Sequence, residues 1–385
     1  MVNRDRLAEV FKTLVQIDSV SKKEGAIATA LQEIFESLGG EVHVDGAGPN
    51  VEGDTGNLIA MFKGSGADGV PLLLNAHMDT VQPGEGVKML FSDGTFTSDG
   101  STILGADDKS ALAVIIEAIR TLQENRLPYG PLEVVVTICE EVGLLGAKNL
   151  DYSMIKAKYG YSLDATDTEG IVTRAPAANH VEFKVHGRDA HAGASPEKGI
   201  NAIHLASGAI SEIRVGRIDE ETTANIGVIE GGKATNIVPS LVTVAGEVRS
   251  HNPEKLEEET QKIIQSFERE VSNYKEAFPS DDGLPKVEVG VRQDFSVLKI
   301  PEDHPVVALA KEAASGLGRK METKTSGGGS DANIFLGHGI VTGILGTGMK
   351  DMHTVRESIQ LDDMVKSVEL LLEIVQLHAK KSRQG

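Results

Sequence analysis

Histidine and acidic residues follow apolar runs of the chain at spacings that suit metal binding. His77 and Asp79 come directly after the apolar run 71–75, in the motif AHMDTV. A histidine followed two residues later by a carboxylate can present its imidazole to a metal ion while the acid orients the ring. Taken alone, the same motif also fits an ordinary solvated loop, so further acids must decide between the two interpretations.

Two pairs of adjacent acids stand at the ends of predicted elements. Asp107 and Asp108 begin a helical stretch in GADDKSALAVIIEAI, and Glu140 and Glu141 follow the apolar run of LEVVVTICEEVG. The aspartates could simply cap the helix, because carboxylates accept its free N–H groups. The glutamates are harder to explain as surface residues, because successive side chains of a strand point in opposite directions. A carboxylate pair at a strand tip suits a general base beside a metal ligand.

Asp164 in YSLDAT and His353 in DMHTVRE complete this pattern. Five separate segments thus bring acids or imidazoles to what should be one edge of a single sheet. Two imidazoles and several carboxylates, without a thiolate, suit zinc, manganese or cobalt. So many carboxylates repel one another unless cations neutralise them, which favours two ions over one. A pair of ions polarises a carbonyl and lowers the pKa of a bound water molecule.

The elements that position these residues alternate between short apolar runs and helical stretches. This alternation predicts an α/β fold with a mixed, mostly parallel central sheet flanked by helices. Ser21 and Glu24 resemble a capping box at the start of one helix. Between residues 178 and 293 the pattern changes to βαββαβ, which predicts an inserted, ferredoxin-like domain. The first part of the metal-binding domain would then be 1–177 and the second part 294–385. The inserted domain is expected to contain strands 180–186, 224–229, 240–248 and 286–291, with helices 196–213 and 253–278.

Composition excludes several classes of function. The 385 residues include 38 Lys and Arg against 57 Asp and Glu, a net charge of −19, which argues against nucleic acid as a partner. The single cysteine, Cys139, excludes an internal disulfide and a cysteine-rich zinc site, and it fits a reducing compartment. No apolar run approaches the ~20 residues that span a bilayer, and the first residues do not resemble a signal peptide. The expected protein is cytoplasmic and has no membrane partner.

Together the motifs resemble those of the co-catalytic zinc peptidases, a family that contains peptidase T, carboxypeptidase G, succinyl-diaminopimelate desuccinylase and aminoacylase. AHMDTV, GADDKS, EEVGLLGA, SLDA and DMHTVRE stand in the family's order along almost the whole chain. GADDKS and EEVGLLGA are most similar to the peptidase T-like branch. The segment between His77 and Asp107 is shorter than in peptidase T, where extra structure helps to recognise the peptide amino terminus. This difference leaves a preference for tripeptides open.

The resemblance implies a role for each acid and imidazole of the site. It implies two divalent ions per chain, most simply zinc, with manganese or cobalt as alternatives. Asp79 would orient one imidazole, and Glu140 would deprotonate the bridging water and pass the proton to the leaving amine. A cis peptide bond is expected after the bridging aspartate, between Asp107 and Asp108. The implied metal ligands are His77, Asp107 as the bridge, Glu141, Asp164 and His353.

The resemblance also implies that the inserted domain closes over the site as a lid and forms a homodimer. His191 in GRDAHAGAS matches a lid histidine that stabilises the developing oxyanion, and Asn236 and Arg249 match substrate-binding positions. Arg249 could bind a substrate carboxylate through two hydrogen bonds. Gly328 lies in SGGGSDANIF, which resembles a loop whose backbone amides reach the substrate. Without the family, these four would be surface or turn residues.

The expected activity is that of a di-metal exopeptidase, most simply an aminopeptidase that releases N-terminal residues from short peptides, as a tripeptidase does. A related amidohydrolase, such as an N-acyl amino acid deacylase or a carboxypeptidase, is the alternative. The two are hard to separate because bond cleavage uses the same groups, while specificity lies in the lid and loops. A third possibility is a non-catalytic, metal-binding dimeric paralogue. Loss of Glu140 or of a ligand would mark such a paralogue, and all of them are present.

Overall fold

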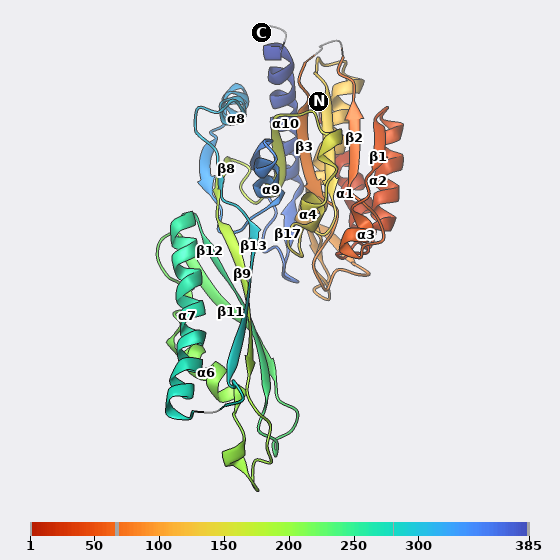
Figure 1. Ribbon diagram of the computed structural model, residues 1–385. Coiled ribbons are helices and arrows are strands. Elements are labelled where there is room, and N and C mark those ends of the chain that lie inside the picture. Colours follow the sequence, from red (N-terminus) through yellow and green to blue (C-terminus); the bar gives the residue numbers. More distant parts are fainter. Residues whose placement is uncertain (1, 66–68, 280, 383–385) are drawn as a thin grey trace. The chain divides into compact units, whose positions relative to one another are not determined.

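The computed structural model describes residues 2–65, 69–279 and 281–382 and divides into two compact units. Unit 1 consists of Met1–Arg174, Lys299–Ser326 and Ser330–Gly385. Unit 2 consists of Ala175–Leu298 together with Gly327–Gly329. Figure 1 shows a helix-covered sheet in unit 1 and a long antiparallel sheet with helices in unit 2. No helix in the described ranges is long and apolar enough to cross a membrane.

The central sheet of unit 1 is mixed. Strand β3 (Leu72–His77) lies parallel to β6 (Leu132–Thr137) and to β7 (Tyr159–Ala165), and β7 lies parallel to β16 (Val341–Gly346). Both β3 and β6 are buried along their whole length, as expected of strands covered on both faces. The prediction of an α/β fold with a mixed, mostly parallel sheet is confirmed. The outer strands are β1 (Glu41–Val44), β2 (Leu58–Phe62), β8 (Gly170–Ala175), β14 (Leu298–Lys299) and β15 (Glu322–Thr325).

Helices cover both faces of this sheet. Helix α4 (Ala106–Glu124) packs against β3 and β7 on one face, and α1 (Arg4–Val15) and α10 (Leu361–Ser382) pack against α4. On the other face Leu73 and Val135 pack in one apolar cluster with Phe335 of α9 (Asp331–Gly337). The remaining helices are α2 (Gly25–Ser37), α3 (Gly48–Val51), α5 (Leu145–Lys148), α8 (Pro305–Gly316) and the 3-10 helix η1 (Tyr152–Met154).

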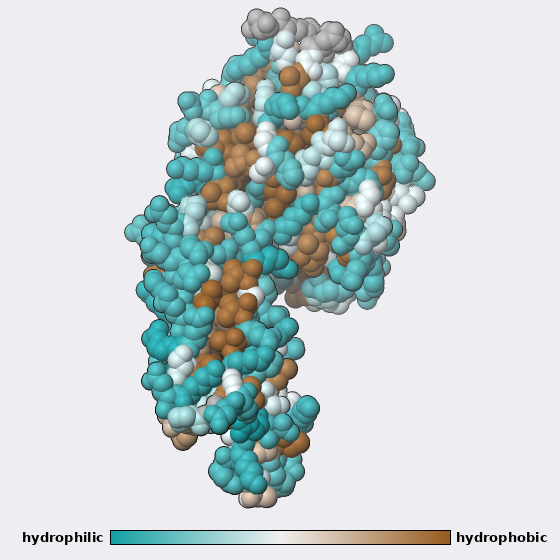
Figure 2. Space-filling view, in the orientation of Figure 1, coloured by the Kyte–Doolittle hydropathy of each residue, from teal (hydrophilic) through white to brown (hydrophobic). Residues whose placement is uncertain are grey.

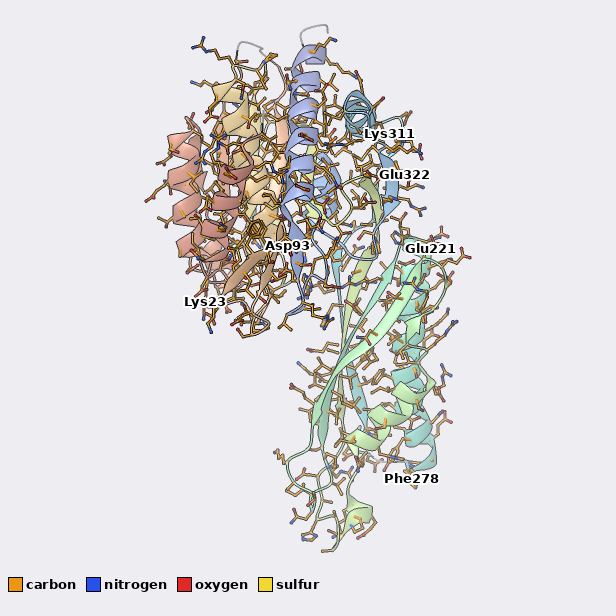
Figure 3. The ribbon with its side chains drawn as sticks, turned by 180° about the vertical axis from the view of Figure 1, so that it is seen from behind. Lys23, Asp93, Glu221, Phe278, Lys311 and Glu322 are labelled. Carbon is orange, nitrogen blue, oxygen red and sulfur yellow. The ribbon has the colours of Figure 1, made fainter. Side chains whose placement is uncertain are left out.

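A small antiparallel sheet also belongs to unit 1. Its strands are β4 (Met89–Ser92), β5 (Thr95–Ser98) and β17 (Ser358–Gln360), with β5 in the middle. Asp93 and Gly94 both have positive φ and form the turn between β4 and β5; Figure 3 labels Asp93. Aspartate followed by glycine suits such a two-residue turn because both tolerate this backbone conformation. The pairing of β17 with β5 ties the chain beyond His353 to the segment before Asp107.

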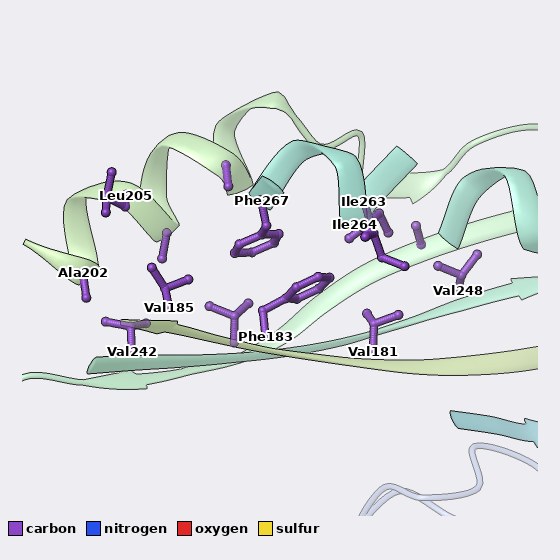
Figure 4. Packing of buried hydrophobic residues seen from close by; sticks show 14 of the residues in the cluster. Val181, Phe183, Val185, Ala202, Leu205, Val242, Val248, Ile263, Ile264 and Phe267 are labelled. Atoms are coloured by element: carbon purple, nitrogen blue, oxygen red, sulfur yellow. The ribbon is translucent and has the colours of Figure 1, made fainter. Parts of the chain in front are cut away.

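Unit 2 is an antiparallel sheet covered by two helices. The sheet order is β10-β11-β12-β9-β13, and the helices are α6 (Ala202–Glu212) and α7 (Pro253–Ala277). Alternate side chains of β9 point toward the helices, where the rings of Phe183 and Phe267 stack with centroids 4.0 Å apart (Figure 4). This unit therefore has a hydrophobic core of its own. Its strands are β9 (Ala177–His186), β10 (Gly216–Arg217), β11 (Thr222–Gly231), β12 (Leu241–Ser250) and β13 (Lys286–Phe295).

The predicted helix 196–213 is wrong at its amino terminus. Pro196–Lys198 forms a separate 3-10 helix, η2, and α6 begins only at Ala202. The backbone is extended at Gly199, and the side chain of Asn201 accepts a hydrogen bond from the N–H of His204, which caps α6. An asparagine in this position is a strong N-cap, and it fixes the start of the helix.

Candidate metal centre and active site

The parallel strands of unit 1 explain why the predicted site residues meet. His77 is the last residue of β3, Asp164 is near the end of β7, and Glu140 and Glu141 follow β6. These neighbouring strands run in the same direction, so their carboxyl ends lie at one edge of the sheet, where α/β proteins bind ligands. Asp107 belongs to the first turn of α4, and His353 lies in the loop between β16 and β17.

Asp107 lies between two imidazoles. Its Oδ1 is 3.1 Å from Nε2 of His77, and its Oδ2 is 3.1 Å from Nε2 of His353. Nε2 of His353 is also 3.0 Å from Oε1 of Glu141. One ligand atom from each of His77, Asp107 and Glu141 lies within 4.8 Å of the others, and the same holds for Asp107, Asp108 and Asp164. Because Asp107 belongs to both groups, the arrangement suits a carboxylate shared by two ions.

His77 is held in one orientation by Asp79. Nδ1 of the ring is 2.9 Å from the carbonyl oxygen of Asp79, which fits a ring that donates from Nδ1 and leaves Nε2 to face Asp107. The carboxylate of Asp79 lies slightly farther from the ring, with Oδ1 at 3.4 Å from Nδ1. That carboxylate accepts hydrogen bonds from the backbone N–H groups of Glu140 (2.9 Å) and Glu141 (3.2 Å). Asp79 therefore places both glutamates as well as the imidazole.

The peptide bond between Asp107 and Asp108 is cis, as the family resemblance implied. Both residues have non-helical backbone angles at the start of α4. Oδ2 of Asp108 accepts a hydrogen bond from the backbone N–H of His77 at 3.1 Å. Its Oδ1 is buried and has no hydrogen-bond partner among the described residues. The sequence predicts Asp108 as half of an acidic pair and as part of the cis bond but gives it no role at the site, whereas the structure groups it with Asp107 and Asp164.

Burial shapes the protonation of the acids. Loss of solvent raises the pKa of Glu140, Asp108 and Asp164 well above the ordinary values of carboxyl groups. Burial also acts to raise the pKa of Asp107, but the hydrogen bonds to His353 and His77 outweigh it and hold that pKa below its ordinary value.

The two imidazoles beside Asp107 have raised pKa values, whereas the pKa of Asp107 itself is lowered. Hydrogen bonds to Asp107 and Glu141 raise the pKa of His353 to about 10. These shifts describe a buried acidic site that needs positive charge. Divalent cations fit this need, since the donors are carboxylate oxygens and imidazole nitrogens and one buried oxygen, that of Asp108, lacks a partner among the described residues.

Glu140 lies in a turn that two buried acids anchor. The backbone N–H of Cys139 donates to Oε1 of Glu24 at 3.0 Å, and that of Glu140 donates to Asp79. The capping box predicted for Ser21 and Glu24 is therefore wrong. Glu24 precedes α2 without capping it, and the Ser21 hydroxyl donates to Oδ2 of Asp79 at 2.7 Å. Tertiary contacts at the site take up both side chains. A glutamate with a raised pKa, as Glu140 has, is suited to accept a proton and to donate it again.

Asp331 is a further buried acid that sequence reasoning missed. It is the first residue of α9, and its Oδ2 accepts hydrogen bonds from Thr137 Oγ1 and from Asn75 Nδ2. Burial raises the pKa of Asp331 to about 6. The available signal was the presence of Asn75 and Thr137, two polar residues in buried strands, which need a buried polar partner.

Four further predicted site residues group with unit 2, namely the catalytic candidate His191 and the substrate-binding candidates Asn236, Arg249 and Gly328. Nδ1 of His191 accepts hydrogen bonds from the backbone N–H groups of Gly193 and Ala194, both at 3.1 Å. The backbone N–H of Ala192 donates to the carbonyl of Asn236 at 2.9 Å, so the segments of His191 and Asn236 lie side by side. Arg249, in β12, donates to Oε2 of Glu247 at 3.0 Å. The roles of these four residues toward a substrate stay predictions.

Comparison with known proteins decides the family. A model of the peptidase family M20/M25/M40 matches residues 73–377. The chain belongs to this family. It is 45% identical over 381 residues to the uncharacterized protein YqjE of Bacillus subtilis, a match that covers 99% of this chain and 100% of the relative.

Two solved structures of relatives are similar to this M20 protein along almost their whole length. The aminopeptidase PepT of Bacillus cereus is 41% identical, with a TM-score of 0.86 and coverage of 97% of this chain and 98% of the relative. A tripeptidase of Staphylococcus aureus is 38% identical, with a TM-score of 0.90 and coverage of 99% and 100%. The resemblance to the peptidase T-like branch is confirmed: the chain is an M20 metallopeptidase related to the peptidase T tripeptidases.

Proposed function

We propose that the protein is a di-metal aminopeptidase that removes N-terminal residues from short peptides, in the manner of a tripeptidase. The observation that carries the proposal is Asp107 placed between the imidazoles of His77 and His353, with Glu140 buried in the neighbouring turn. The names of the two structural relatives, an aminopeptidase and a tripeptidase, support the choice of substrate. We expect it to act in the cytoplasm, where its single, buried Cys139 stays reduced.

The donor set fits two divalent ions, most simply zinc, with manganese or cobalt as alternatives. Asp107 is the residue that both ions would share. When bound, such ions polarise the scissile carbonyl and lower the pKa of a water molecule toward ~7. The other proposed ligands are His77, Glu141, Asp164 and His353.

Proton transfer falls to Glu140. Its buried carboxylate has a raised pKa, so it can take the proton of the attacking water and deliver it to the amine that leaves. Asp79 holds the backbone N–H of Glu140 and thereby fixes the direction of the side chain. Within unit 2, we assign His191 to the developing oxyanion and Arg249 to the substrate carboxylate. Asn236 and Gly328 would bind the peptide backbone.

Substitution of Glu140 by glutamine tests this assignment. The amide has nearly the same shape but cannot accept the proton, so we expect kcat on a tripeptide to fall about 10²- to 10⁴-fold. Metal content, measured by mass spectrometry after dialysis, should stay near two ions per chain, because Glu140 is not a proposed ligand. A variant that keeps most of its activity, or one that loses its metal, would contradict the role.

A panel of substrates separates aminopeptidase activity from the alternatives. Tripeptides with a free amino terminus, the same peptides with an acetylated amino terminus, and N-acyl amino acids should be compared at equal concentration. The proposal requires hydrolysis of the free peptides and loss of hydrolysis upon acetylation. Faster cleavage of N-acyl amino acids would indicate a deacylase, and release of C-terminal residues would indicate a carboxypeptidase. Failure to cleave any of them with metal bound would favour a non-catalytic binding protein.

We also propose that unit 2 makes the protein a homodimer, through the free edge of β13. This strand ends the sheet order, so its outer backbone groups can pair with a second copy. Val289 and Val291 of β13 are 38% and 47% exposed, and Figure 2 shows apolar side chains exposed among the strands of this unit. Burial of these side chains between two copies would stabilise the dimer.

Charged substitutions on β13 test the dimer. We expect Val289→Lys combined with Val291→Lys to reduce the mass measured by light scattering from two chains to one, because lysines on an edge strand oppose pairing. Val215→Lys is the matched control, since Val215 is also an exposed valine of unit 2, at 53%, but lies outside β13. A monomeric wild type, or a dimer that survives both lysines, would contradict the proposed interface.

A further inference from the structure

Glu357 is a buried carboxylate that binds the backbone of the segment carrying Asp107. Glu357 is only 1% exposed. Oε2 accepts hydrogen bonds from the N–H groups of Leu104 at 2.8 Å and Gly105 at 2.7 Å, and Oε1 accepts one from the N–H of Asp107 at 2.9 Å. Each oxygen of a carboxyl group can accept hydrogen bonds from backbone N–H groups. Both oxygens of Glu357 are therefore engaged by one short stretch of backbone.

These N–H groups stand where a helix leaves donors unsatisfied. The first N–H groups of α4 have no carbonyl within the helix to bind, and Gly105, the residue before the helix, offers no side chain as a cap. Gly105 has φ of 79° and Asp107 has non-helical angles, so the chain turns sharply here. Glu357 supplies the missing acceptors from a distant part of the sequence. It thereby fixes the backbone of Asp107 and the direction of its carboxylate.

Glu357 also belongs to the loop that carries His353. Glu357 lies four residues after His353, in a loop whose ends are joined by two backbone hydrogen bonds between Lys350 and Ser358. The side chain of His353 is 51% exposed, and its φ is 61°, so its position depends on the shape of this loop. Glu357 thus connects the loop of one imidazole directly to the backbone of the aspartate that this imidazole contacts.

We propose that Glu357 is a positioning residue of the metal centre. It locks the backbone of Asp107 to the loop of His353, and so it keeps the Asp107 carboxylate between the two imidazoles. In the described part of the chain its hydrogen bonds are to three backbone N–H groups and to no side chain of the site, so its role is to hold ligands rather than to be one. The inference rests on the proposed two-metal site, but not on the substrate of the enzyme.

Glu357→Gln is the variant that tests the inference. Glutamine replaces one acceptor oxygen by an NH₂ group that would face a backbone N–H, so the hold on the Asp107 segment is broken at constant side-chain size. We expect the affinity for Mn²⁺ or Zn²⁺, measured by titration of metal-free protein without substrate, to fall about 10- to 100-fold. With tripeptide substrate, excess metal should restore kcat, and KM should stay unchanged.

Glu133→Gln is the matched control. Glu133 is also a buried glutamate of unit 1, and it accepts backbone hydrogen bonds from Lys156 and Ala157 at 3.0 and 2.9 Å, away from the proposed ligands. Both variants should lower the thermal unfolding temperature, but Glu133→Gln should keep the metal affinity of the wild type. Equal affinity losses in the two variants, or wild-type affinity in Glu357→Gln, would overturn the inference.

Two further measurements keep the test decisive. If Glu357→Gln does not fold, Glu357→Asp keeps the charge on a shorter side chain; it should bind metal less tightly than the wild type, and unchanged affinity would refute the positioning role. Metal titration does not require turnover. A wild type that hydrolyses no peptide, while the variants keep the expected order of metal affinities, would therefore reject the proposed function and leave the role of Glu357 standing.

Discussion

Individual buried carboxylates hold together the segments that carry the site. Glu24 accepts the N–H of Cys139, Asp79 accepts those of Glu140 and Glu141, and Glu357 accepts that of Asp107. Buried backbone N–H groups need acceptors, and irregular turns at strand ends cannot supply them from a regular ladder. Each turn of the site is therefore fixed by an acid from another part of the chain, which couples the ligands to one another.

The titration of Asp331 should be visible in the stability of the metal-free protein. Burial raises its pKa from the ordinary 3.8 to about 6 in the folded state. The carboxyl group of Asp331 therefore binds its proton more tightly in the folded protein than in the unfolded chain. This difference adds to the free energy of unfolding in full below pH 4, and the contribution is lost as the pH rises through about 6. Asp331→Asn imitates the protonated form and removes this titration.

Unfolding by urea at several pH values, in the presence of a chelator, checks this expectation. Relative to the wild type, Asp331→Asn should gain about 1 to 3 kcal/mol of unfolding free energy between pH 4 and pH 7. The lost negative charge also eases ionisation of Glu140 and Asp164, which acts in the same direction. A difference between the two proteins that does not change with pH would show that Asp331 does not titrate in this range.

At the level of residues, sequence motifs pointed to the acids and imidazoles that meet at the sheet edge. They could do so because each motif follows a strand or begins a helix, and parallel strands gather their ends at one place. The roles of Glu24, Asp108 and Asp331 at the site were missed because their contacts lie 31 to 194 residues away in the chain. A local pattern such as a capping box cannot report a contact of that kind.

Elements were predictable where hydrophobic periodicity was strong. The apolar runs of β3 and β6 indicated the central strands, since strands buried on both faces are mostly apolar. The start of α6 was missed because Asn201, not the earlier Pro196, provides the cap. The small sheet of β4, β5 and β17 was missed although Asp93 and Gly94 form a typical hairpin turn. Strands of three or four residues are too short to show a period.

A buried ion pair joins α1 to α4. Nε and Nη2 of Arg6 bind the two carboxylate oxygens of Glu117 at 2.7 and 2.9 Å, and the Glu117 side chain is fully buried. Arg6→Ala would leave that carboxylate buried without its charge partner. We expect a loss of about 3 to 5 kcal/mol in the free energy of unfolding.

Arg4 provides the control for this prediction within the same helix. It pairs with Asp362, but both side chains are more than half exposed. Exposed pairs contribute about 0 to 1 kcal/mol, so Arg4→Ala should change stability little. Chemical denaturation of both variants makes the comparison. Equal losses would show that the Arg6 and Glu117 pair contributes no more than a surface pair.

At the scale of the whole molecule, the described residues of each unit form a hydrophobic core within that unit. The core of unit 2 is formed by one side of its sheet and by α6 and α7, while the site acids and imidazoles at the sheet edge belong to unit 1. A chain of 385 residues is long enough to form separate cores. A substitution that destabilises the core of unit 2 should therefore leave unit 1 folded and its metal content unchanged.

Phe267→Ala tests this independence. Phe267 is buried in unit 2 and stacks on Phe183, so its truncation should cost unit 2 about 3 to 5 kcal/mol. Hydrogen exchange should become faster in β9, β12 and α7 but stay unchanged in β3 and β6. Metal content should remain that of the wild type. Phe335→Ala in unit 1 is the counterpart and should reverse the pattern, because Phe335 packs against the central sheet that carries the site. Loss of metal from Phe267→Ala, with faster exchange throughout the chain, would show instead that the two units unfold as one.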